Sequence, residues 1–112
     1  MTVDVYAQFF SADMTFAETK RRAALVVLSS DSERGQIRYT ASAAFFPHVD
    51  DEDFAVSYDA YFSVVMYEGK GRRSKKREAE LMEKLRETVD SITNAAGGKI
   101  DWNSPLRDAR IS

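Results

Sequence analysis

The chain has 112 residues, of which 44% are hydrophobic and 30% are charged, and its formal net charge is -2. This length suits one folded domain, and the balance of apolar and charged residues is typical of a globular protein rather than a disordered one. The absence of cysteine excludes disulfide bonds, thiolate nucleophiles and Cys-ligated metal centres. The sequence has no long apolar run and no basic leader, so we expect no membrane span, no signal peptide and a cytoplasmic location.

Hydrophobic patterning predicts three strands in the first half of the chain. Residues 3–10 and 36–46 alternate between apolar and polar, as strands with one buried face do. The continuous apolar run at 23–28 predicts a strand buried on both faces. Residues 31–35 are rich in turn formers and predict a hairpin loop. Residues 11–22 fit either a short helix or a second strand, and we favour extended structure or a turn.

A fourth strand is predicted over residues 54–68. It is longer than a small domain needs, so we expect a bend or bulge within it. Its alternation places Tyr61, Val65 and Tyr67 on one face, which is exposed if a helix covers only the other face. Such a surface favours a homodimer interface; the alternative is that these side chains pack under a loop or the C-terminal tail.

A long helix is predicted over residues 74–96. Ser74 is a suitable N-cap and Gly97 a suitable C-cap. The expected buried stripe follows the three- and four-residue spacing of a helix and consists of Leu81, Leu85, Val89 and Ile92. A short strand at 100–102 and a flexible or loosely docked tail at 103–112 complete the chain.

The order of these elements predicts a single domain, residues 1–112, of the α+β class. Alternating strands joined by short loops form an antiparallel meander of four to five strands. The helix stripe has one large partner available, the apolar face of that sheet, so we expect two layers with the C-terminal helix packed on one face.

Few residues suggest catalysis or a cofactor. His48 and the acidic residues at 50–53 could be drawn as a metal site, but a run of acids without calcium-loop spacing is more typical of a solvated turn. Neither a nucleophile elbow nor a nucleotide-binding glycine motif is present. We therefore expect no metal, no cofactor and no enzymatic activity, although a carboxylate pair such as Asp59 with Glu68 has no sequence signature that would reveal it.

The strongest functional signal is a basic run that leads into the helix. Its cations are Lys70, Arg72, Arg73, Lys75, Lys76 and Arg77. A helix N-terminus carries partial positive charge, so clustered cations there are locally unfavourable and suggest a function. The run is a candidate binding site for nucleic acid or another polyanion; the alternative is a solvated loop and first helix turn.

The segment from Gly71 to Ala79 resembles the start of the last helix in double-stranded RNA-binding domains. In that family a glycine-rich loop, a serine and two lysines lead into an alanine-rich helix after three antiparallel strands. The resemblance implies that Lys75 and Lys76 contact phosphates across a groove. The sequence departs from the family where Leu81 and Met82 replace small residues.

Two classes of function remain. The first is a small non-enzymatic module that binds nucleic acid, another polyanion or an acidic protein through the basic run. The second is a protein-interaction or assembly subunit that dimerises through the aromatic face of the sheet.

Overall fold

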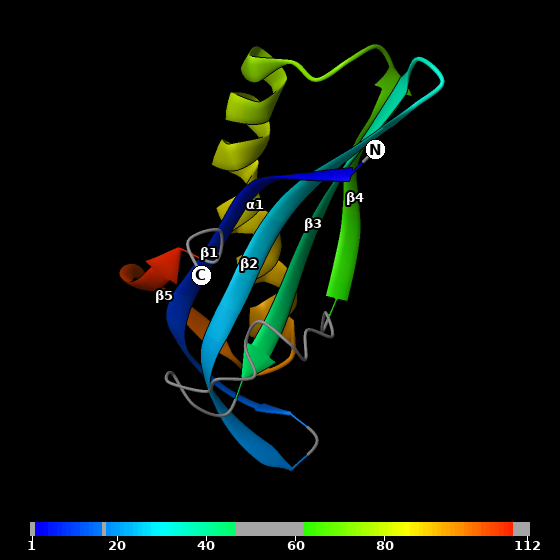
Figure 1. The fold of residues 1–112 in the computed structure, drawn as a ribbon. Coiled ribbons are helices and arrows are strands. Elements are labelled where there is room, and N and C mark those ends of the chain that lie inside the picture. Colours follow the sequence, from blue (N-terminus) through cyan, green and yellow to red (C-terminus); the bar gives the residue numbers. More distant parts are fainter. Residues whose placement is uncertain (1, 17, 47–61, 109–112) are drawn as a thin grey trace.

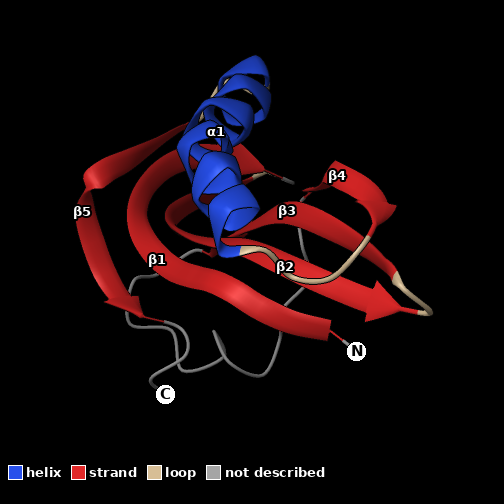
Figure 2. Ribbon diagram, turned by 90° about the horizontal axis from the view of Figure 1, so that it is seen from above, coloured by secondary structure: helices blue, strands red, loops and turns tan. Residues whose placement is uncertain are grey.

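The computed structural model describes residues 2–16, 18–46 and 62–108. Within these ranges the chain forms β1 (Thr2–Phe16), β2 (Thr19–Glu33), β3 (Gln36–Phe46), β4 (Phe62–Lys70), α1 (Lys75–Ala95) and β5 (Lys99–Asp108). The strands make one antiparallel sheet in the order β4-β3-β2-β1-β5. Helix α1 lies across one side of this sheet, as Figures 1 and 2 show. The predicted α+β fold, a meander with one long helix on one face, is confirmed.

Strands β1 and β2 form a longer hairpin than the sequence predicts. Their pairing continues to Phe16 and Thr19, through the segment that looked ambiguous. A register shift between Ser11 and Met14 interrupts the two-residue period there. Because the strand signal depends on that period, the shift concealed the continuation of β1.

The hairpin between β2 and β3 closes with a two-residue turn. Glu33 pairs with Gln36, and both turn residues, Arg34 and Gly35, have positive φ angles of 53° and 77°. This is the backbone that two-residue hairpin turns require, and glycine adopts it without strain. A hairpin is therefore present where it was predicted, but the turn is shorter than residues 31–35, because β2 continues to Glu33.

The sheet buries apolar side chains on both of its faces. The larger cluster, on the helix side, includes Tyr39, Leu28, Leu81, Leu85 and Val89. A smaller cluster on the opposite side consists of Ala7, Phe9, Ala23, Leu25, Val27, Ala44 and Phe46. The helix stripe is as predicted for Leu81, Leu85 and Val89, whereas Ile92 is half-buried and Thr93 is fully buried.

Both ends of α1 match the predicted caps. Ser74 is the N-cap, and Gly97 follows the C-cap residue with a φ of 82°. The N–H of Gly97 donates to the Asn94 carbonyl, and the N–H of Gly98 donates to the Thr93 carbonyl. These two bonds form a Schellman motif, which ends the helix and turns the chain toward β5.

Strand β5 pairs with β1 at the edge of the sheet and extends well beyond the predicted segment 100–102. Residues 109–112 lie outside the described residues, as do His48, the acidic loop and the first half of the predicted strand 54–68. None of the helical residues that the structure describes forms a segment long and apolar enough to cross a membrane.

Candidate functional site

A buried polar network joins the basic run to the sheet. Tyr39, in the middle of β3, is fully buried, and its hydroxyl donates to Oε2 of Glu78 over 2.7 Å. Arg73 donates two hydrogen bonds to the same carboxylate, from Nε to Oε2 at 2.9 Å and from Nη2 to Oε1 at 3.0 Å. A bidentate pair of this kind is among the stronger polar contacts in proteins. Arg73 is one of the residues predicted to bind an anionic partner, but its guanidinium is already paired with the Glu78 carboxylate.

The network shifts the acidity of two groups. Hydrogen bonds from Arg73 hold the pKa of Glu78 below its ordinary value, even though burial acts in the opposite direction. Burial, and then the hydrogen bond to Glu78, raise the pKa of the Tyr39 hydroxyl. Both shifts favour an ionised Glu78 beside a neutral Tyr39 at neutral pH.

Two backbone contacts hold the loop that carries the basic run. The N–H of Ser74 donates to the Tyr39 hydroxyl at 3.3 Å, and the N–H of Gly71 donates to the Gly35 carbonyl at 2.9 Å. Figure 1 shows this loop crossing from the end of β4 to the start of α1 at the same end of the sheet as the β2–β3 turn. The loop is therefore attached both to the core and to that turn.

The first turn of α1 has its own partners. The Ser74 side chain accepts a hydrogen bond from the Arg77 N–H at 3.3 Å, and the Ser74 carbonyl accepts from the Glu78 N–H at 2.9 Å. Glu78 also places negative charge in the first turn, where the helix dipole favours it. These contacts offset part of the unfavourable charge that the basic run brings to this helix end.

Arg77 is the second cation of the run with an internal contact. Its guanidinium lies over the Tyr67 ring, 3.7 Å from the centroid. Tyr67 faces the helix side because a register shift between Tyr39 and Thr40 changes the alternation of β4 against β3. The bulge expected in this strand is therefore present, and it moves Tyr67 away from the face predicted from simple alternation.

Four cations of the basic run remain exposed: Lys70, Arg72, Lys75 and Lys76. None of their side chains has a hydrogen bond or a salt bridge to any residue in the described ranges. We call these four residues the basic surface. The geometry thus divides the predicted set, because Arg73 and Arg77 fix the loop while the other four can meet a partner.

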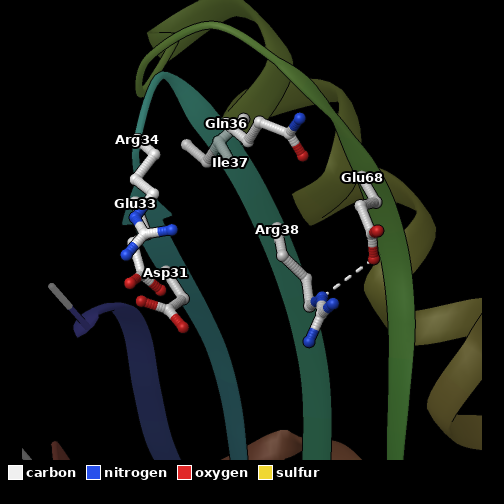
Figure 3. A pocket seen from close by; sticks show the side chains of 7 residues that line it. All are labelled: Asp31, Glu33, Arg34, Gln36, Ile37, Arg38 and Glu68. Carbon is white, nitrogen blue, oxygen red and sulfur yellow. Dashed lines mark hydrogen bonds and ion pairs between the residues drawn. The ribbon is translucent and has the colours of Figure 1, made fainter.

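An open hollow of about 340 Å³ lies beside the basic surface, on the sheet face opposite α1. Figure 3 shows its charged lining, in which Arg38 of β3 is bonded to Glu68 of β4. That pair is 2.8 Å apart, and Asp31 of β2 is the cross-strand neighbour of Arg38. Arg34 and Glu33 complete the charged part of the lining. Because both signs of charge are present and exposed, this hollow does not continue the basic surface.

The two predicted interface residues that the structure describes, Val65 and Tyr67, do not share one face. Val65 is 51% exposed on the edge strand β4. Tyr67 packs on the helix side, with its ring centroid 6.4 Å from that of Tyr39. Tyr61 lies outside the described residues.

Sequence reasoning missed the two residues that organise the site, Tyr39 and Glu78. In the sequence Tyr39 is one position of an alternating strand, and Glu78 is one of several charged residues where the helix begins. Their contact joins residues 39 positions apart, so local patterning gives no sign of it.

Comparisons with known proteins found no family model, curated protein or solved structure that matches this chain. The resemblance to double-stranded RNA-binding domains therefore rests on its short motif alone and supports no step of the argument below.

The lowered pKa of Glu78 predicts a specific loss of stability in acid. A carboxyl group with a lower pKa in the folded state stabilises the fold above its unfolded pKa, about 4.5. That contribution is lost as the pH falls from this value through the folded pKa. The difference between the melting temperatures at about pH 7 and about pH 3 should therefore be smaller in Glu78→Gln than in wild type.

The matched control for this prediction is Glu80→Gln, which removes an exposed glutamate from the same helix and should keep the wild-type pH dependence. Equal pH dependence in wild type and Glu78→Gln would show that the network does not perturb Glu78.

Proposed function

We propose that this protein is a non-enzymatic module that binds the phosphate backbone of nucleic acid through the basic surface. The observation that carries the proposal is the combination of four exposed, internally unpaired cations with a loop that is anchored to the core. A solvated charge run needs no such anchoring, whereas a binding site gains from having its charges positioned before the partner arrives.

Three contacts supply the positioning: Gly71 to Gly35, Ser74 to Tyr39, and Arg73 to Glu78. They restrict the backbone on both sides of Arg72 and immediately before Lys75. Ordering the loop on binding would therefore cost less than ordering a free chain. The Ser74 side chain already accepts the hydrogen bond of the Arg77 N–H at the start of the helix. The attraction for phosphate is therefore assigned to the lysine and arginine side chains rather than to this backbone group.

The charge distribution supports an anionic partner in spite of the overall charge of -2. Four cations within seven consecutive residues create a local positive potential that net charge does not reveal. Lysine and arginine contacts to phosphate release condensed counterions, so the affinity should depend on salt. The cysteine-free sequence agrees with action in a reducing compartment such as the cytoplasm.

A triple substitution tests the proposal. With four phosphate contacts, the log–log plot of affinity for duplex DNA against salt should have a slope of about -3.6. Replacing Lys70, Lys75 and Lys76 with Gln should flatten this slope by about 2.7 and leave the melting temperature nearly unchanged. Fluorescence anisotropy with a labelled duplex at several salt concentrations measures the slope.

The control removes the same amount of charge elsewhere, by replacing Arg22, Lys84 and Lys99 with Gln, and should leave the slope near the wild-type value. Absence of wild-type binding to any nucleic acid at low salt would refute the proposal and would leave an acidic protein as the partner to test.

A second candidate function is assembly of a homodimer through β4. This strand lies at the edge of the sheet, and Val65 is the exposed large hydrophobic residue among those the structure describes. An edge strand can pair with a second copy by extending the sheet. The bulge and the charged Glu68 and Lys70 discourage pairing toward the end of β4, so the favoured contact lies near Val65.

Light scattering tests whether the protein is a dimer or a monomer in solution. At micromolar concentration the wild-type protein should have the mass of a dimer, and Val65→Lys should have the mass of a monomer because it places charge in the contact. Ser91→Lys, at an exposed position of α1, separates an effect at Val65 from a general effect of added charge. A wild-type protein with only monomer mass would exclude the dimer.

A further inference from the structure

The basic surface is bordered on two sides by surfaces of mixed charge. On the sheet face opposite α1 the hollow of Figure 3 carries Asp31, Glu33 and Glu68 beside Arg34 and Arg38. Along α1 the exposed residues that follow the first turn include Glu80, Glu83 and Lys84. In both sets the acids outnumber the cations, so the stretch of unopposed positive charge ends at each border.

The aromatic ring that contacts the basic run is already engaged. Tyr67 lies beneath Arg77 and beside Tyr39. The Trp102 ring belongs to β5, at the opposite edge of the sheet from β4, and packs against Arg86 and Asp90 in the second half of α1. Proteins that hold unpaired bases use free aromatic faces for stacking. Neither of these two rings offers such a face beside the basic surface.

One of the two arginines in the loop cannot read a base edge. Arginine reads guanine through a bidentate contact, but the guanidinium of Arg73 already makes a bidentate contact with Glu78, which leaves Arg72 as the free arginine of the basic surface. The other three cations are lysines, which act on phosphate as point charges. The basic surface is therefore better suited to phosphates than to bases.

We propose that the basic surface takes a short run of about four consecutive phosphates from one nucleic-acid strand and makes no contact with the bases. This inference rests on the proposed function and adds to it the length and the chemistry of the footprint. The number of free cations sets the number of phosphates, the mixed-charge borders set the length, and the engaged Tyr67 ring leaves no stacking face beside the run in the described part of the chain.

Length dependence tests the footprint. Binding of oligothymidylates of about 4, 8 and 16 nucleotides should follow nearly the same log–log salt slope, about -2.8 for four contacts to a single strand. Affinity should rise with oligonucleotide length only in proportion to the number of overlapping positions at which the strand can occupy the site. A slope that steepens continuously with length would overturn the short footprint while leaving nucleic-acid binding intact.

Base composition tests the mode of recognition. Oligothymidylate and oligoadenylate of equal length should bind within about threefold of each other. A preference above about tenfold for one base would overturn recognition through phosphate alone. Equal binding of inorganic polyphosphate at matched charge would assign the surface to free polyphosphate and overturn the nucleic-acid strand as its ligand.

The mixed-charge border along α1 is tested by neutralising its acids. Glu80→Gln combined with Glu83→Gln should raise the affinity for the longest oligonucleotide severalfold more than for the shortest. The matched control, Asp4→Asn combined with Glu87→Gln, removes the same charge farther from the basic surface and should change both affinities equally. An equal change in the border variant would contradict a role for these acids. Complete absence of binding at low salt would instead refute the proposed function itself.

Discussion

The contact between Glu78 and its two partners, Tyr39 and Arg73, is the constraint on which the rest of this end of the molecule depends. It places an ionised carboxylate at the junction between the sheet and the first turn of α1. A buried charge is tolerated only when it is paired and hydrogen-bonded, and here both carboxylate oxygens have partners. Removing either partner would leave Glu78 incompletely satisfied, at a cost on the order of 1–3 kcal/mol.

The same contact helps to explain how six cations can cluster at the start of a helix. Arg73 is neutralised by Glu78, and the Arg77 guanidinium is placed over the Tyr67 ring, whose face attracts cations. Both residues then serve to hold the loop. Lys75 and Lys76 then account for most of the unfavourable interaction with the helix dipole. Both side chains are exposed, so water and salt screen this interaction. Cations with and without internal partners are thus neighbours in one charge run, and the proposed binding is assigned to those without.

Local rules predicted those parts of the fold in which local chemistry decides the structure. Ser74 and Gly97 marked the ends of α1 because capping depends on residues within one turn of the cap. The bounds of β3 followed from an uninterrupted two-residue alternation. The length of β1 and the side of the sheet that Tyr67 faces could not be predicted, because register shifts at Ser11/Met14 and Tyr39/Thr40 break that alternation. The sequence located the candidate site by its cations. It could not show which cations have internal partners, because the pairing of Arg73 depends on the long-range contact between Glu78 and Tyr39.

A matched pair of substitutions at adjacent arginines tests this division most directly. Arg72→Gln should flatten the log–log salt slope for duplex DNA by about 0.9 and leave the free energy of unfolding unchanged, because Arg72 is free to contact phosphate. Arg73→Gln should leave the slope unchanged and lower the free energy of unfolding by about 1–3 kcal/mol, because it deprives Glu78 of its bidentate partner. Equal effects of the two substitutions on slope and on stability would contradict the account.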